Sequence, residues 1–237
     1  MQGGILYNIV DKMDSDYGDS RHERVRQELR YIRKSIEDSR GVEIDKLPTL
    51  YLFHVLKEQG KINVLYENDG FFAFEPARDG KPLALADTVD APMSAMHFLV
   101  VPKTRIANGV FCEQMKNFNY IAFSECAEKA ADIFRTTRLQ SRLDEINKNA
   151  LWSDITNFKC IAYKGTRTED LQKAREYSQE LHYSVHLYPH NTVNDLHVHV
   201  WCKHLATVSY DLQVKTNEFK NTPLDVLLNE VTTENFV

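Results

Sequence analysis

The chain has 237 residues, is 43% hydrophobic and carries a formal net charge of −5 at pH 7. This length and hydrophobic content suffice for one good core, in one domain or in two small ones. The negative charge excludes an extended nucleic-acid footprint, so any polyanion binding must come from a local basic pocket.

Cysteine spacing and hydropathy bear on the compartment. The four cysteines, at 112, 126, 160 and 202, lie far apart without a CxxC pair, which predicts neither a disulfide framework nor a structural zinc site. No apolar run approaches the roughly eighteen residues of a membrane helix, and we find no secretory signal pattern. We therefore expect a soluble protein of the cytoplasm, with the nucleus as an alternative, and no association with membranes.

Residues 1–60 are predicted to form an N-terminal extension with two helices. A capping box at 20–23 precedes apolar residues at helical spacing up to about residue 38, and a second helix spans 49–59 and stops at Gly60. These helices either pack on an edge of the following sheet or offer a surface for a partner or a homodimer.

The main domain is predicted at 61–210 and begins with a hairpin. Residues 61–74 have a strand, turn, strand pattern, because the Asn-Asp-Gly sequence at 68–70 is a strong hairpin signal. A long loop rich in Pro, Gly, Asp and Ala follows at 75–94. Residues 96–103 then predict an apolar strand that ends at a proline.

The second half of the chain alternates predicted helices and strands, with a break at 147–154 and a C-terminal tail at 211–237. The expected elements are a long helix at 113–138, a strand at 158–163, a polar helix at 168–180, a strand at 184–187, a last strand at 206–210 and a short helix at 224–231.

The most informative segment is Asp-Leu-His-Val-His-Val-Trp at 195–201. Successive side chains of a strand point to opposite faces, so His197 and His199 share one face while Val198 and Val200 share the other. The apolar face can enter a core, and the imidazole face remains for chemistry. A solvated face or a metal site are the alternative interpretations.

The loop before this strand supplies Pro189, a turn-forming Asn191 and the hydroxyl of Thr192, which is typical of a phosphate-cradling loop. Together the loop and strand resemble the histidine triad (HIT) superfamily, with its signature His-φ-His-φ-His-φ-φ, in which φ is apolar. The likeness is strongest to the nucleotide-binding hydrolases written His-x-Pro-Pro-x-Asn-Ser-Val-x-His-Leu-His-Leu-His.

Aligned on that pattern, Asp195 stands at the first histidine, His197 at the central nucleophile and His199 at the third histidine, while Thr192 takes the place of the serine. The hairpin at 61–74 and the sequence His-Phe-Leu-Val-Val-Pro-Lys at 97–103 also resemble HIT domains. The matches span roughly 62–204, about sixty per cent of the chain. The resemblance implies an α+β fold, with a HIT-like central antiparallel sheet, one long packed helix and added N-terminal helices.

The resemblance also implies roles for individual residues. A neutral imidazole at His197 would attack phosphorus to give a covalent nucleotidyl intermediate. His199 would donate to phosphate oxygens or protonate the leaving group, and His97 would support the site. His186 has the alternative of being only a loop histidine. The substrate-binding candidates are Asn191, Thr192, Asp195, His97, His186 and Lys103.

We therefore expect a hydrolase or transferase that cleaves a nucleotidyl phosphoramidate, phosphoanhydride or phosphoester bond of a purine nucleotide or nucleotide conjugate, with no cofactor and no resident metal. Three alternatives stay open. Asp195, and Pro76 at the position of the family's ribose-binding acid, fit a nucleotide-binding module without turnover. His197, His199 and Asp195 could instead hold zinc. The Leu-His-Val-His core is shared with scavenger decapping enzymes, so a cap analogue is a third alternative.

Overall fold

The computed structural model describes residues 52–78, 81–82, 92–106, 118–153, 168–186, 193, 196–210 and 221–232. The predicted helix at 20–38 and the predicted strand at 158–163 lie outside these ranges, as do three predicted site residues, Asn191, Thr192 and Asp195. Within the described ranges, no helix has both the length and the hydropathy needed to cross a membrane.

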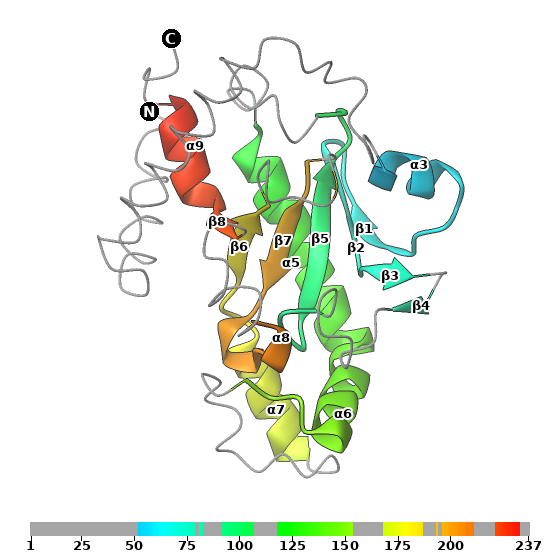
Figure 1. Cartoon of the computed structure of the whole chain (residues 1–237), viewed down its shortest axis with the longest axis vertical. Coiled ribbons are helices and arrows are strands. Elements are labelled where there is room, and N and C mark those ends of the chain that lie inside the picture. The colour runs from blue at the N-terminus through cyan, green and yellow to red at the C-terminus, as the bar shows by residue number, and fades with distance from the viewer. Residues whose placement is uncertain are drawn as a thin grey trace.

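The centre of the fold is a six-stranded sheet in the order β1-β2-β5-β7-β6-β8, in which every neighbouring pair is antiparallel. This sheet and its packed helices confirm the predicted α+β fold (Figure 1). The strands are β1 (Val64–Glu67), β2 (Phe71–Phe74), β5 (His97–Pro102), β6 (His182–Val185), β7 (Val198–Trp201) and β8 (Thr222–Pro223).

The predicted hairpin is present as β1 and β2, and Asn68 organises its turn. The side-chain oxygen of Asn68 accepts hydrogen bonds from the backbone N–H groups of Gly70 at 3.1 Å and Phe71 at 2.9 Å, which is the local pairing that favours asparagine in turns. The amide nitrogen of the same side chain donates to the backbone oxygen of Ala122 at 2.7 Å. The turn is therefore tied to a helix as well as to itself.

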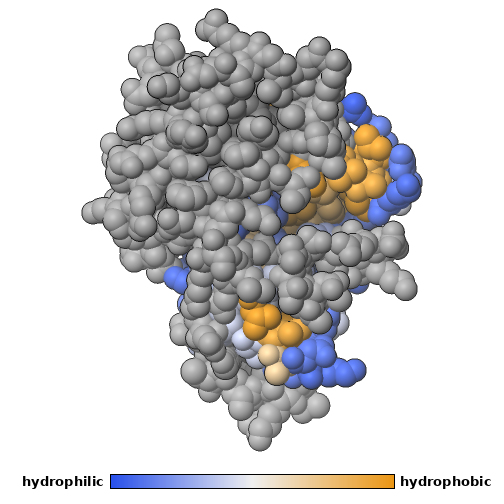
Figure 2. All heavy atoms as spheres, viewed as in Figure 1, coloured by the Kyte–Doolittle hydropathy of each residue, from blue (hydrophilic) through white to orange (hydrophobic). Residues whose placement is uncertain are grey.

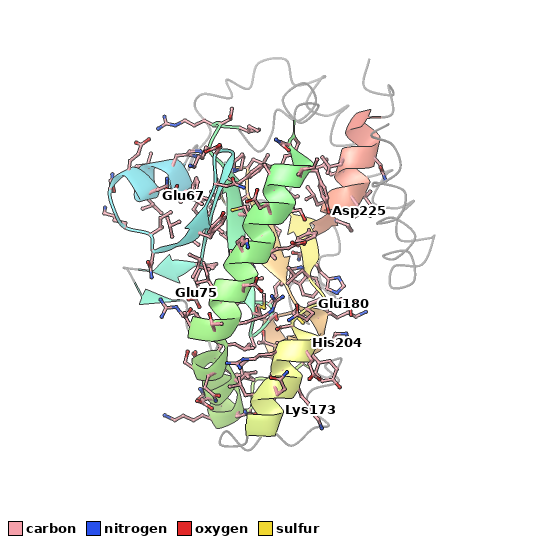
Figure 3. All side chains as sticks on the ribbon, turned by 180° about the vertical axis from the view of Figure 1, so that it is seen from behind. Glu67, Glu75, Lys173, Glu180, His204 and Asp225 are labelled. Carbon is pink, nitrogen blue, oxygen red and sulfur yellow. The ribbon has the colours of Figure 1, made fainter. Side chains whose placement is uncertain are left out.

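That helix is α5 (Tyr120–Thr137), which packs along one face of the sheet (Figure 3). It starts later than the predicted residue 113, because Asn119 caps it by accepting from the backbone N–H of Ala122 at 3.1 Å. Small and aromatic residues recur at helical spacing on its inner side, so the helix can lie close to the strands. These buried residues are Phe123, Cys126, Ala127, Ala130, Ala131 and Phe134.

A second helix, α6 (Leu139–Asn149), follows α5 directly and was not predicted. A buried ion pair ties it to the sheet: Arg142 Nε donates to Glu75 Oε1 at 2.8 Å, and Arg138 Nε lies 3.8 Å from Glu75 Oε2. Glu75 comes directly after β2 and is engaged on the helix-covered side of the sheet.

Two further helices confirm predictions, namely α7 (Thr168–Tyr177) and α9 (Leu224–Thr232). The short strand β8 lies just before α9 and joins the edge of the sheet beside β6. Residues of the predicted C-terminal tail therefore take part in the central sheet.

The predicted last strand at 206–210 is wrong. A 3-10 turn at Lys203–Leu205 leads into isolated bridges from Ala206 to Ser94 and from Thr207 to Trp152. The backbone N–H of Tyr210 then bonds to the oxygen of Thr207 at 3.0 Å, which closes the short helix α8 (Val208–Tyr210) instead of extending a ladder. The loop predicted at 75–94 also contains a small hairpin, β3 (Ala77–Arg78) with β4 (Lys81–Pro82).

The strand register separates an apolar face from a histidine face. Leu99 on β5, His199 on β7 and Ser184 on β6 lie opposite one another, and so their side chains point to the same side. That side is opposite to the one covered by α5, and it carries His97 and Trp201 as well. In Figure 1 the strands lie in front of α5, and α3 (Leu52–Glu58) lies beside β1.

Candidate active site

Four histidines from three adjacent strands meet on the histidine face. His97 is on β5, His197 and His199 belong to the β7 segment, and His186 follows β6; all four are at most 8% exposed. Ring nitrogens of His186, His197 and His199 lie within 4.8 Å of one another, and the rings of His186 and His199 stack at 3.9 Å. The structure thus brings these four sequence-predicted residues into one cluster.

A hydrogen-bonded chain fixes the protonation of His199. The backbone N–H of Met93 donates to Nδ1 of His97 at 3.2 Å, so this nitrogen must carry the lone pair. Burial, followed by electrostatic repulsion from Arg142 and His197, lowers the pKa of His97 to about 3, so its ring is neutral at pH 7 and its proton lies on Nε2. That proton is donated to Nδ1 of His199 at 3.0 Å. The remaining nitrogen of His199, Nε2, therefore carries a proton and is a donor.

The segment that supplies the first donor is held in place by the chain after β7. The N–H of Ala95 donates to the oxygen of Leu205 at 2.8 Å, and the N–H of Thr207 donates to the oxygen of Met93 at 2.9 Å. The hydroxyl of Thr207 also donates to the oxygen of Pro92 at 2.7 Å. These bonds fix the peptide group that orients His97.

His186 has the opposite polarity from His199. Its Nε2 lies 2.9 Å from the side-chain oxygen of Asn221, and because an amide oxygen can only accept, the imidazole is the donor. In the neutral ring the lone pair then lies at Nδ1. The stacked pair consequently offers one donor, from His199, and one acceptor, from His186, beside His197.

An apolar wall adjoins His197, and sequence analysis did not assign it. Phe53 of α3 meets His197 edge to face at 5.0 Å and contacts Phe74 at 5.2 Å. Helix α3 is anchored by His54, whose Nε2 donates to the backbone oxygen of Pro102 at 2.9 Å. Figure 2 shows hydrophobic surface in the part of the view where Figure 1 places α3 and the β1–β2 hairpin. The helix was predicted, but its spacing did not indicate which face would meet the histidines.

Lys103 takes a different position from the histidines. Its Nζ lies 3.5 Å from Glu67 Oε2, which also accepts a hydrogen bond from Lys57 at 2.7 Å. This ion-pair group lies at the end of β1, beside α3. A contact between Lys103 and a substrate stays a prediction.

The cluster also has the residue types of a divalent-metal site, since two histidines on one strand and a third from its neighbour can hold zinc. Each ligating nitrogen must offer a lone pair to the metal. At His199 the lone pair is at Nδ1 and is used by His97; coordination through Nε2 would require both rings to reverse their protonation. The N–H of Met93 opposes this reversal because it can only donate. The hydrogen bonds therefore favour an oxyanion as the ligand.

Comparisons with known proteins give little beyond this geometry. No protein-family model and no curated protein matches the chain. Among solved structures, the chain is similar to the crystal structure of the aprataxin ortholog Hnt3 from Schizosaccharomyces pombe, with 18% sequence identity and a TM-score of 0.30. The match covers 72% of this chain and 65% of that chain, so the chain spans less than two thirds of that structure's length. At this TM-score the likeness adds no weight to the assignment of a function.

Proposed function

We propose that the protein is a nucleotide-binding hydrolase or transferase that cleaves a nucleotidyl phosphoramidate, phosphoanhydride or phosphoester bond through a covalent intermediate on His197. The observation that carries this proposal is the cluster of buried imidazoles, in which His197 lies beside a fixed donor, His199, and an acceptor, His186. Phosphorus chemistry needs a nucleophile, a donor to the oxygens and a group that exchanges a proton.

In the first half-reaction, a ring nitrogen of His197 attacks phosphorus and forms a P–N bond. The bond from phosphorus to the leaving nitrogen or oxygen breaks, and the leaving group departs with the electron pair. His186, first protonated at Nδ1 from solvent, gives this proton to the leaving group. The Nε2–H of His199 donates to a non-bridging oxygen, where negative charge develops in the transition state.

In the second half-reaction, water attacks the nucleotidyl group and the P–N bond breaks. His197 regains its lone pair, and the proton of water passes to Nδ1 of His186, which restores the protonated His186 with which the first half-reaction began. The products are a nucleoside monophosphate and the protonated leaving group. A second acceptor in place of water would make the same site a transferase.

A nucleotide is the substrate class that this site would suit. Phe53 lies edge to face against His197 and is backed by the buried Phe74, and an aromatic side chain in this place can pack against a base while the phosphate lies at the histidines. We propose a purine as the base. Cap analogues belong to the same class of substrate and are tested together with simpler nucleotides.

A nucleotide-binding module without turnover is the second candidate function, and Asp195 is the observation that favours it. A carboxylate about 4 Å from a phosphate charge would cost roughly 4 kcal/mol at an effective dielectric of about 20. Such a module would bind nucleotides and would release no product. The experiment below therefore measures binding and turnover separately.

The test uses the full chain with a panel of nucleoside phosphoramidates, dinucleoside polyphosphates and cap analogues. We expect product release from at least one class, and an acid-labile nucleotidyl adduct on the peptide that contains His197 in rapidly quenched samples. His197→Asn should abolish turnover and the adduct while nucleotide affinity changes little, because the amide stays polar but cannot form the P–N bond.

His204→Asn is the matched control, since His204 pairs with Glu180 outside the cluster and should keep full activity. Turnover by His197→Asn equal to that of the wild type would overturn the covalent mechanism. Nucleotide binding by the wild type without any product would favour the binding module.

A further inference from the structure

We propose that Asn221 is a positioning residue of this site, which holds His186 in the one orientation that lets Nδ1 exchange a proton with the substrate or water. The proposal rests on the function proposed above and extends the site to the C-terminal part of the chain. Asn221 is 4% exposed, and its side-chain oxygen lies 2.9 Å from His186 Nε2.

The sheet brings the two residues together. In the antiparallel pairing of β6 with β8, Val185 lies opposite Thr222 and Ser184 lies opposite Pro223. The residue after Val185 and the residue before Thr222 are therefore neighbours at the end of this ladder. These two residues are His186 and Asn221, which are 35 positions apart in the sequence.

A second chain of donors ends on the same amide oxygen and supports its orientation. The indole N–H of Trp201, which can only donate, lies 3.3 Å from the hydroxyl of Ser184. The hydroxyl proton of Ser184 is in turn directed to Asn221 Oδ1 at 3.5 Å. With the oxygen in this place, both Ser184 and His186 have an acceptor, and the amide is fixed from two sides.

An amide oxygen suits a histidine that changes its protonation during the reaction. Nε2 of His186 carries a proton in the neutral ring and in the imidazolium, so its bond to Asn221 survives both states. Only Nδ1 gains and loses a proton. Asn221 thus keeps the ring in one orientation through both half-reactions without itself touching the substrate.

The first arm of the test measures the tautomer and needs no turnover. In the full chain labelled with ¹⁵N-histidine, long-range ¹H–¹⁵N correlation spectra show which ring nitrogen carries the proton, and His186→Gln identifies the resonances. We expect His186 of the wild type to be protonated at Nε2. Asn221→Leu should give a mixture of tautomers, whereas Asn221→Asp, which keeps an acceptor oxygen, should keep the Nε2 proton.

The second arm measures turnover of a nucleoside phosphoramidate. Asn221→Leu should lower kcat about 10- to 100-fold with little change in KM, by analogy with the hydrogen-bond partners that orient metal-bound histidines, whose loss has an effect of this size. Asn221→Asp should recover most of the rate. Asn149→Leu, an exposed position at the end of α6, is the control and should match the wild type in both arms. If Asn221→Leu does not fold, Asn221→Ser is used in its place, because the serine side chain is too short for its hydroxyl to reach the ring of His186.

A proton on Nδ1 of His186 in the wild type would overturn the proposal, even if every variant failed to fold. An unchanged tautomer in the folded Asn221→Leu variant would overturn it as well. Absence of turnover in the wild type would count against the proposed enzyme alone, because the tautomer arm still decides whether Asn221 orients His186.

Discussion

The two faces of the central sheet differ in how their buried side chains are satisfied. On the face covered by α5, residues such as Phe98, Val100 and Val200 contact Phe134 and other apolar groups, and no hydrogen bond is needed. On the opposite face, His97, His199 and His186 are buried almost as deeply. These histidines form hydrogen bonds that run from strand to strand.

This difference separates stability from chemistry within one sheet. An apolar contact has no direction, so neighbouring side chains can exchange roles as long as volume is kept. A hydrogen-bonded histidine has a direction, because each ring nitrogen is a donor or an acceptor and the next group must match it. We therefore expect substitutions on the apolar face to change the free energy of unfolding, and substitutions of the hydrogen-bonded histidines of the cluster to change turnover.

The largest effect on stability is expected from Phe134→Ala. Phe134 is completely buried on α5, and its removal would leave a cavity that costs about 3–5 kcal/mol in the free energy of unfolding. Denaturant unfolding at 25 °C measures this loss, and turnover per folded molecule should stay the same. Ile121→Ala is the control on the same helix, since Ile121 is 73% exposed. A large fall in kcat of the folded Phe134→Ala protein would break the separation between the two faces.

A smaller effect, on the rate, is expected from His199→Ala. Loss of a transition-state donor costs on the order of 10²-fold in kcat, which corresponds to about 2.7 kcal/mol. Initial rates with a nucleoside phosphoramidate measure this change. His182→Ala removes a histidine from the same face that stacks on Trp201 and should keep the rate. If His199→Ala lowered the melting temperature and spared the rate, the role of His199 would be structural.

The third effect, which is the smallest for a single step of one pH unit, is on the response of stability to pH. The pKa of His97 is about 3 in the folded protein, below the ordinary value of about 6.5, so the unfolded chain takes up this proton first on acidification. Its contribution to stability is therefore complete above pH 6.5 and is lost as the pH falls towards 3, at up to about 1.4 kcal/mol per pH unit. Denaturant unfolding measured at several pH values across this range gives the free energy of unfolding. This free energy should fall less steeply with decreasing pH in His97→Gln than in the wild type. Equal slopes in the two proteins would show that His97 is not held neutral by burial.

Much of the fold could be predicted because it depends on local patterns. The hairpin signal at 68–70 and the alternation in 197–201 are read from neighbouring residues, and both strands formed where expected. The predicted strand at 206–210 did not form, because contacts with a distant part of the chain decide the backbone conformation there. Thr207 bonds to Pro92 and Met93, which are far away in the sequence. Helix α6 was missed although its buried residues, Leu139, Arg142, Leu143 and Ile146, have helical spacing, because the predicted helix ended at residue 138 and α6 begins at the next residue.

The site was predictable only in part, for a similar reason. Strand periodicity placed His197 and His199 on one face, and the structure confirms that placement. Other members of the site come from distant parts of the chain. Asn221, the partner of His186, follows it by 35 residues, and Phe53, which contacts His197, lies on α3 before all the strands of the sheet. An asparagine before a threonine and a proline gives no sign of such a contact, and only the strand order β7-β6-β8 explains it.

The donor that begins the His97 chain has an evolutionary consequence, because it is a peptide group and not a side chain. Any residue other than proline at position 93 would still present an N–H to His97. Most substitutions at position 93 therefore leave unchanged which ring nitrogen of His199 is the donor. Sequence drift at position 93 can change the packing against Trp201 while the direction of the proton is inherited unchanged.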